Sequence, residues 1–295
     1  MNLLIIGASG FIGGNVLAHA RRAGLRAAGT SFSAQRPGLL RFDMLRDDIR
    51  PVIPRDFLEG AGACAVLCSA VSRIDACWAE RERSYALNVL GTIKTLAALK
   101  ELGIKTAFLS SEAVFDGERG YYNEDSPTSP VNEYGKYKVA VEKYMLSDFP
   151  ESLILRLSMV VADTPGEDHL FAHWHDQISQ GQPLVCIAGQ IFSPTFVGDV
   201  ARGIVTALGM DLRGLHHLSN SEYFQREELA RQFLYAAGAK SAVVVKPLAE
   251  FNFPEPRALK TYLDGSRFAR TADIRFTSMR EVIAALMLRT GLPRP

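Results

Sequence analysis

The chain has 295 residues, a formal net charge of +1 and 47% hydrophobic residues, so it is long enough to bury one large core or two coupled ones. The near-neutral charge gives no electrostatic reason to expect a nucleic-acid or anionic-membrane partner. No apolar run reaches the length of a membrane span, and the first one begins so early that no secretion signal is expected. The 4 cysteines suggest no disulfide or metal framework, and we therefore expect a cytoplasmic protein.

A glycine-rich turn follows the first apolar run. Leu3–Ile6 predicts a buried strand, and the residues from Asn15 onward predict a helix. Between them, Gly7 permits a tight turn, Gly10 lets the backbone approach a pyrophosphate, and Gly13 lets the helix pack closely on the strand. Phosphates would then lie on the free N–H groups at the start of the helix. The predicted loop also contains Ser9, Phe11 and Ile12. The alternative is a strand-to-helix turn without a ligand.

Strand-like and helix-like segments alternate through the first half of the chain. This alternation predicts an α/β fold with a doubly wound, Rossmann-type parallel sheet. The next expected strands are 25–30, 39–43, 63–70, 105–111 and 153–157, and a long helix is expected over 80–102. Residues 1–162 are the expected dinucleotide-binding domain, and 163–295 are expected to form mainly a smaller, interleaved substrate lobe. The chain is expected to return to the first domain around 190–218, with Asp199 capping a helix there.

The end of the second expected strand bears on the choice of cofactor. A carboxylate there would hold a ribose 2′-OH and repel a 2′-phosphate, but residues 30–36 contain no acid. Because the hydroxyl of Ser31 and the guanidinium of Arg36 suit a phosphate, the sequence favours NADP(H) over NAD(H). Alternatively, Arg36 is a solvated loop charge. Further cofactor contacts are expected at Asp43, Met44, Ser69, Ala70 and Asn88.

Tyr134 and Lys138 are four residues apart and so share one face of an expected helix. A phenol has an ordinary pKa of about 10, and a nearby ammonium favours the phenolate and lowers that pKa. Tyr134 could then give a proton to a carbonyl oxygen as hydride arrives. Lys138 could also hydrogen-bond a nicotinamide ribose, and Ser111, at a strand end, could hold the substrate oxygen. Such a Tyr–Lys pair also occurs by chance on exposed helices, but its position after the glycine loop and the Ser-Ser strand end favours catalysis.

These features together resemble the extended short-chain dehydrogenase/reductases, and within them the dTDP-4-dehydrorhamnose reductase branch. The matching segments are 7–13, 87–92, 110–117, 129–138, 193–199 and 257–263, so the resemblance covers nearly the whole chain. It implies a catalytic triad of Ser111, Tyr134 and Lys138. In that triad Tyr134 protonates the C4 oxygen of a 4-keto sugar nucleotide while NAD(P)H delivers hydride to C4. The resemblance also implies a homodimer, because many relatives pair through two long helices, which here would include residues around 85–100 and 134–148.

The chain departs from the family pattern where the sugar is expected to bind. The family often has an aromatic residue where this chain has Ala113, and a tryptophan where it has Met159. Near Arg257, Ala258 replaces a proline and Lys260 an asparagine. The expected substrate contacts are Val71, Ala113, Met159 and Arg257. Small or flexible side chains at these places reshape the pocket and leave the identity of the substrate open.

Two other functions stay open. A 4,6-dehydratase is disfavoured, because Ala113 stands where those enzymes have a glutamate. A sugar-nucleotide epimerase of the same fold needs no such glutamate and is therefore not excluded. The other function is that of a non-enzymatic NADP-binding regulatory subunit, resembling the beta subunit of methionine adenosyltransferase. The altered pocket residues favour this alternative, and the complete triad argues against it. His169 and His173 would share a helix face and His175 would not, so no metal site is expected.

Overall fold

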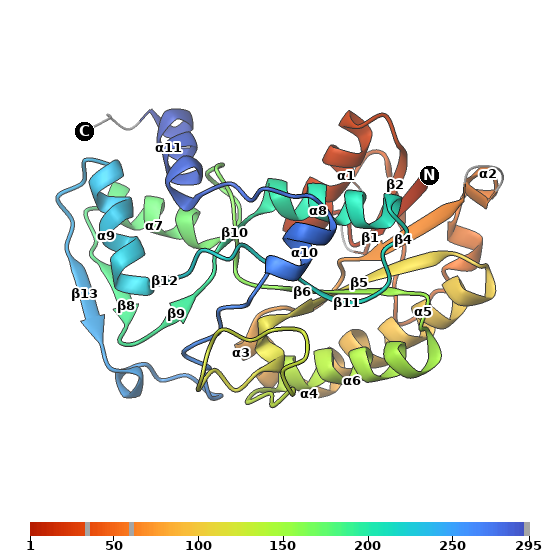
Figure 1. Ribbon diagram of the computed structural model, residues 1–295, viewed down its shortest axis with the longest axis horizontal. Coiled ribbons are helices and arrows are strands. Elements are labelled where there is room, and N and C mark those ends of the chain that lie inside the picture. The colour runs from red at the N-terminus through yellow and green to blue at the C-terminus, as the bar shows by residue number, and fades with distance from the viewer. Residues whose placement is uncertain (33–35, 59–61, 292–295) are drawn as a thin grey trace.

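Figure 1 shows the computed structural model, in which residues 1–32, 36–58 and 62–291 are described. Within these ranges seven parallel strands form one sheet in the order β11-β6-β5-β4-β1-β2-β3. Their bounds are β1 Asn2–Ile6, β2 Arg26–Ser31, β3 Leu39–Arg41, β4 Ala63–Leu67, β5 Lys105–Ser111, β6 Leu153–Leu157 and β11 Gly214–Leu218. The strand order reverses beside β1, and ligands of such sheets bind beyond the carboxyl ends of the strands at that point. The prediction of a doubly wound parallel sheet is confirmed.

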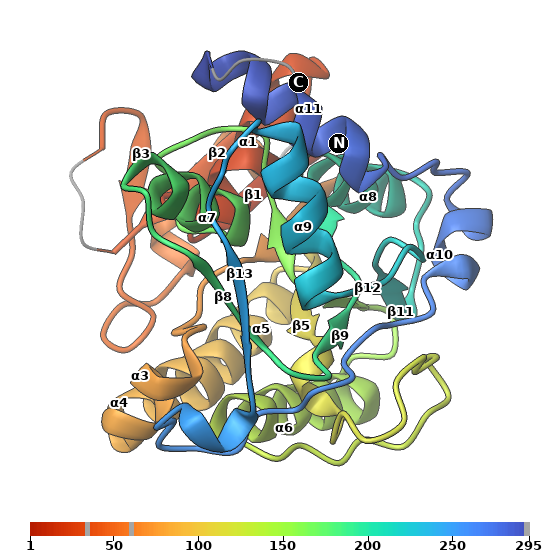
Figure 2. The same ribbon diagram turned by 90° about the vertical axis from the view of Figure 1, so that its left-hand side faces the viewer.

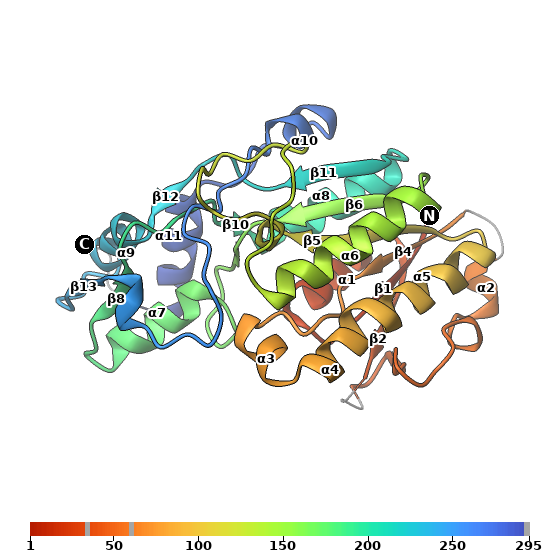
Figure 3. The same ribbon diagram turned by 90° about the horizontal axis from the view of Figure 1, so that it is seen from below.

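The side chains of β1 alternate between two cores, one on each face of the sheet. Leu3 and Ile5 belong to the first core, and Leu4 and Ile6 belong to the second. Both faces are covered by helices, and every residue of β1 is therefore buried. Helices α1 and α8 lie on one face and α5 and α6 on the other (Figures 1 and 3). Their bounds are α1 Phe11–Arg22, α5 Thr92–Glu101, α6 Glu133–Asp148 and α8 Val197–Gly209.

The single long helix expected over 80–102 is interrupted. The chain forms α4 (Arg81–Tyr85), a π-helical turn over Ala86–Gly91, and then α5. The turn contains Asn88, whose side-chain amide accepts from the N–H of Val71 and donates to its carbonyl oxygen, both at 2.9 Å. Turns of this kind are frequent at functional sites. Here the turn ties the segment after β4 to the helix, and periodicity alone does not reveal that bond.

The second lobe has its own core. Figure 1 shows α7, α9 and the strands β8 and β13 at the end away from the main sheet, and in Figure 2 this end faces the viewer. Large side chains of three helices meet there, including Trp174, Phe233 and Leu286. The helix bounds are α7 Leu170–Ser179, α9 Arg226–Ala236 and α11 Met279–Thr290, and the parallel strands are β8 Leu184–Ile187 and β13 Val243–Lys246. Shorter elements are α2 Arg55–Leu58, α3 Ile74–Ala79, β7 Val160–Val161, β9 Ile191–Phe192, β10 Thr195–Phe196, β12 Phe224–Gln225 and α10 Ser266–Thr271.

The prediction that Asp199 caps α8 is wrong. The residue at the cap position is Phe196, and Asp199 lies inside the first turn. Its carboxylate accepts from the backbone N–H of Thr277 and from Arg202, both at 2.6 Å. Asp199 therefore fastens the chain before α11 to the Rossmann lobe. No helix in the described ranges is both long enough and apolar enough to cross a membrane.

Candidate active site

The glycine loop joins β1 to α1 at the carboxyl end of the sheet. Gly7 has a φ of +88°, which an L side chain rarely adopts. A Cβ on Gly13 would lie 2.3 Å from the carbonyl oxygen of Gly7. The helix can therefore pack this closely on the loop only because residue 13 has no side chain. A Cβ on Gly10 would meet only the ordinary contact of 3.5 Å with that oxygen. The first turn of α1 has no acidic residue, and its N–H groups are therefore suited to a pyrophosphate.

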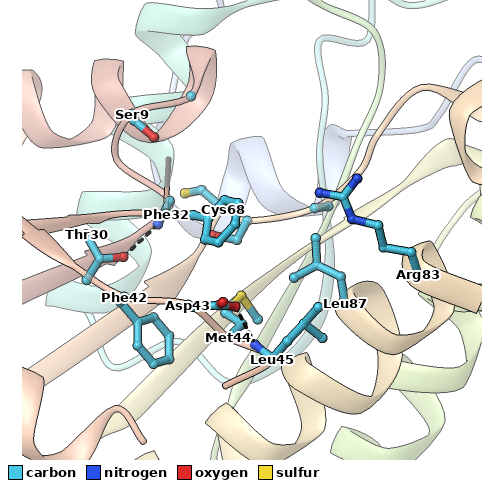
Figure 4. Close-up of a pocket in the computed structure, with 14 residues that line it drawn as sticks. Ser9, Thr30, Phe32, Phe42, Asp43, Met44, Leu45, Cys68, Arg83 and Leu87 are labelled. Atoms are coloured by element: carbon cyan, nitrogen blue, oxygen red, sulfur yellow. Dashed lines mark hydrogen bonds between the residues drawn. The ribbon is translucent and has the colours of Figure 1, made fainter. Parts of the chain in front are cut away.

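One side of the cleft is a pocket of about 230 Å³ beside the glycine loop. Figure 4 shows Thr30 and Phe42 on one side of it and Arg83 and Leu87 on the other. The hydroxyl of Thr30 accepts from the N–H of Gly7 at 3.1 Å and so fixes the loop to β2. The lining includes seven predicted cofactor contacts: Gly7, Ser9, Gly10, Asp43, Met44, Ser69 and Ala70. The size and position of this pocket suit an adenosine.

A larger cavity of about 540 Å³ continues from this pocket, and Gly10, Cys68 and Ala70 line both. Its lining brings the rest of the glycine loop together with predicted catalytic and substrate residues. These are Phe11, Ile12, Gly13, Ser111, Tyr134, Lys138, Ala113 and Met159. The chain therefore folds so that a dinucleotide loop and a Ser–Tyr–Lys group face one continuous space.

The start of α6 places Tyr134 near Ser111. The side chain of Asn132 accepts from the N–H of Gly135 at 2.9 Å and caps the helix. A Cβ on Gly135 would lie 2.0 Å from the carbonyl oxygen of Ala113, so a glycine is needed for the helix to pack this closely on the segment after β5. One turn further, Lys138 is buried and donates from Nζ to the carbonyl oxygen of Leu109 at 2.7 Å.

Burial shifts the pKa values of the ionisable side chains in this cavity. Burial raises the pKa of Tyr134, and the charge of Glu112 raises it further, while the side chain of Ser111 acts in the opposite direction. Burial lowers the pKa of Lys138 to about 8. The sequence predicts that Lys138, aided by the positive ring of an oxidised nicotinamide, lowers the pKa of Tyr134. In the protein by itself that pKa is raised, mainly by burial, although the Lys138 ammonium lies 5.6 Å from the ring centre. Tyr134 is therefore a neutral phenol over the physiological pH range.

Glu112 is a residue of this site that the sequence reasoning did not assign to it. It lines the larger cavity, and the hydroxyl of Ser111 donates to its Oε2 at 3.3 Å. Burial raises the pKa of Glu112 to about 7. Its position directly after Ser111 was a usable signal, because a carboxyl at a strand end points toward the same cleft. Phe32, Arg83 and Asp168 also line the cleft without a motif that predicts them.

Several predicted contacts do not line either cavity. Arg36 is exposed, and Ser31 is buried at the end of β2, while residues 33–35 between them lie outside the described residues. Asn88 holds Val71 as described above rather than facing the cleft. Arg257 contacts Asp75 on α3 and so bridges the two lobes. The contacts predicted for these residues stay predictions.

The three histidines around α7 make separate contacts. His169 precedes the helix, is buried, and stacks on Phe11 with ring centres 5.5 Å apart. His173 pairs with Asp168 at 2.8 Å. Over the parts of the chain that the structure describes, no group of three or more His, Cys, Asp or Glu side chains is arranged to hold a metal ion.

The chain is similar to known proteins over nearly its whole length. A family model described as the RmlD substrate binding domain matches residues 1–291. The chain belongs to this family. Its resemblance to the extended short-chain dehydrogenase/reductases of the dTDP-4-dehydrorhamnose reductase branch is thereby confirmed. Membership of this family also supports the prediction that the protein is an oxidoreductase.

Relatives of this RmlD family member are named for different functions. The dTDP-4-dehydrorhamnose reductase of Mycobacterium tuberculosis (strain CDC 1551 / Oshkosh) is 26% identical over 267 residues, which cover 88% of this chain and 83% of the relative. Methionine adenosyltransferase 2 subunit beta of Danio rerio is 28% identical over 236 residues, covering 77% and 71%. A crystal structure of dTDP-4-dehydrorhamnose reductase from Bacillus anthracis str. Ames in complex with NADP has a TM-score of 0.83 at 20% identity, covering 98% of this chain and 99% of that one. This likeness shows the fold.

Proposed function

We propose that this protein reduces a 4-keto sugar nucleotide with NAD(P)H, with Tyr134 as the proton donor. The observation that carries the proposal is the continuous cleft in which Gly10 lines both pockets and Ser111, Tyr134 and Lys138 line the larger one. Such a cleft holds a dinucleotide beside a reacting carbonyl. The relatives named as dTDP-4-dehydrorhamnose reductases support the choice of a sugar nucleotide.

The described residues fit a nicotinamide dinucleotide. Gly10 leaves room at the loop, and the N–H groups that begin α1 would hold the pyrophosphate. Asp43, Met44 and Phe32 would surround the adenosine, with Arg83 facing them from α4. When bound, the reduced nicotinamide supplies the hydride. NADP(H) is favoured over NAD(H) because residues 30–36, at the end of β2, contain no acid to hold a ribose 2′-OH or to repel a 2′-phosphate.

The proton is supplied by the chain itself. In this mechanism the Ser111 hydroxyl and the Tyr134 phenol both hold the C4 oxygen of the substrate. As hydride reaches C4, the carbonyl π electrons move to the oxygen, which takes the phenol proton. The high pKa of Tyr134 keeps that proton in place beforehand. Lys138, with a pKa of about 8, is largely an ammonium at pH 7 and stabilises the phenolate that forms.

The test measures NADPH oxidation with a panel of 4-keto sugar nucleotides. Tyr134→Phe is expected to lower kcat at least about 100-fold, as removal of a general acid does. Tyr137→Phe is the matched control, because Tyr137 lies on the same helix with its hydroxyl directed to the carbonyl oxygen of Arg81 at 3.4 Å. Stoichiometric NADPH consumption supports a reductase. Interconversion of two sugar nucleotides without net consumption would instead show an epimerase.

A second function is favoured by the relative named methionine adenosyltransferase 2 subunit beta. Under this alternative the chain would bind NADP and regulate a catalytic partner without turnover of its own. Binding of NADPH without activity on any 4-keto sugar nucleotide, together with co-purification of a methionine adenosyltransferase, would support it. Turnover that depends on Tyr134 would exclude it.

A further inference from the structure

A buried ion pair lies behind the proposed catalytic group. Arg156 on β6 donates from Nη2 to Oε2 of Glu142 on α6 at 2.7 Å and from Nε to Oε1 at 2.9 Å. The two side chains are 4% and 3% exposed. A buried pair of this kind is often no more stabilising than apolar residues of similar volume. A contribution to stability therefore does not by itself explain why Arg156 and Glu142 are buried here as a charged pair.

The pair is attached to the same strand end that carries Ser111. Glu142 lies one helical turn after Lys138 on α6, and both side chains bond to consecutive residues of β5. Lys138 donates to the carbonyl oxygen of Leu109 at 2.7 Å, and Ser110 donates from its hydroxyl to Oε1 of Glu142 at 2.5 Å. These two bonds fix the distance between α6 and β5 directly before Ser111.

The charge of Glu142 also acts on Lys138. Burial lowers the pKa of the Lys138 ammonium, and Glu142 is the largest influence that raises it, ahead of the thiols of Cys68 and Cys77. Tyr134, from the same helix, presents its ring to the ammonium.

Arg156 is a charged group that faces Glu142 from another element, and His217 lies behind it. Arg156 holds the carboxylate from β6, and the Nε2 atom of His217 on β11 lies 3.4 Å from Nη1 of Arg156. Burial lowers the pKa of His217 to about 3, so this imidazole is neutral. The arginine therefore fixes the carboxylate in place, and the negative charge of that carboxylate raises the pKa of Lys138.

We propose that Glu142 is a positioning residue for the proposed reduction. Clamped by Arg156 and Ser110, it holds α6 on β5 so that Lys138 and Ser111 keep their places, and it keeps a negative charge beside the Lys138 ammonium. This inference rests on the proposed function for its kinetic consequence only. The effect on Lys138 is a property of the protein without substrate.

The experiment compares Glu142→Gln, Arg156→Met and the double variant. Glu142→Gln removes the negative charge and keeps the shape and the bond to Ser110. Arg156→Met breaks the same ion pair but leaves the carboxylate. The double variant leaves no unpaired buried charge and carries the test if Glu142→Gln alone does not fold. The pKa of Lys138 is measured by NMR titration of protein with ¹³C-labelled lysine, and the Lys138→Met spectrum identifies the signal.

We expect the pKa of Lys138 to fall by about one unit or more in Glu142→Gln and in the double variant, and not in Arg156→Met. Relative to the parent protein, kcat of Glu142→Gln is then lowered more at pH 8 than at pH 6.5, because more Lys138 is neutral. An unchanged Lys138 pKa, or equal falls in Glu142→Gln and Arg156→Met, would overturn the proposal. If the parent protein reduces no keto sugar while the titration behaves as expected, the proposed function fails and the inference about Glu142 and Lys138 stands.

Discussion

The hydroxyl of Ser111 donates to the carboxylate of Glu112, the next residue along the chain, at 3.3 Å. The group expected to hold the substrate oxygen is therefore already engaged with a neighbour whose charge depends on pH. Burial raises the pKa of that carboxyl to about 7. The state of Glu112 thus changes within the range in which such an enzyme works.

Glu112→Gln is expected to flatten the pH dependence of the proposed reduction. Above about pH 7 the ionised Glu112 retains the Ser111 hydroxyl and raises the pKa of Tyr134, and both effects oppose proton transfer to a carbonyl oxygen. In the parent protein kcat/KM should fall as the pH rises through 7, and this fall should be reduced in the variant. Profiles of kcat/KM against pH measure the difference, and two parallel profiles would contradict the role given to Glu112.

The same substitution should change stability in a pH-dependent way. The folded-state pKa of Glu112, about 7, is above the ordinary value of 4.5, so the folded protein binds this proton more tightly than the unfolded chain. Stability is therefore lost as the pH rises between these two values. Glu112→Gln should raise Tm at pH 8 and leave it nearly unchanged at pH 4. A thermal melt at both pH values checks this, and an equal shift at both would indicate an effect unrelated to the proton.

Two arginines make different predictions about cofactor choice. Arg36 belongs to the segment predicted to favour a 2′-phosphate, whereas Arg83 lines the pocket proposed for the adenosine. Arg36→Ala should weaken NADPH binding several-fold and leave NADH binding unchanged, because only NADPH carries the phosphate. Arg83→Ala should weaken both cofactors alike. Nicotinamide fluorescence titrations measure all four dissociation constants. Equal effects of Arg36→Ala on NADPH and NADH would remove this arginine from the phosphate site.

Glycine substitutions test the close approach of α1 to the loop. Gly13→Ala should destabilise the fold by more than about 1 kcal/mol, because its Cβ would lie 2.3 Å from a backbone oxygen that belongs to the loop. Gly209→Ala is the matched control at the end of α8, where a Cβ meets nothing within 4 Å. That change should stabilise by about 0.5–1 kcal/mol. Urea unfolding measures both, and cofactor binding should weaken only in Gly13→Ala.

Ala113 and Met159 line the larger cavity with the proposed catalytic group. Ala113→Tyr would place a ring in the space where the sugar is expected. It should lower kcat/KM for the best substrate of the parent protein at least about tenfold, while the affinity for NADPH stays within about twofold, because the glycine loop is unaltered. Met159→Trp tests the other wall in the same assay. Unchanged kcat/KM in both variants would show that the sugar binds elsewhere.

Local sequence patterns were sufficient for the elements that lie within one stretch of chain. Lys105–Ser111 and Leu153–Leu157 form the expected strands because each is a short apolar run between turn signals. The glycine spacing and the four-residue step from Tyr134 to Lys138 are likewise local, since each is set by the geometry of one turn or one helix. The long helix was less well predicted, because the π-helical turn around Asn88 accompanies a bond to Val71, and periodicity does not encode such a bond.

The sequence by itself determined the alternating elements of the doubly wound fold, the glycine loop and the Tyr134–Lys138 pair, because each depends on residues close together in the chain. Ser111 lies on a different element from that pair, and its grouping with them came from its position at a strand end and from the family resemblance. Only the tertiary structure showed that Arg83 lines the cleft, that Arg257 contacts Asp75, and that Arg156 clamps Glu142 behind Lys138. Each of those relationships joins side chains from separate elements. Which ones meet is decided by how helices pack on strands, and burial then sets their pKa values.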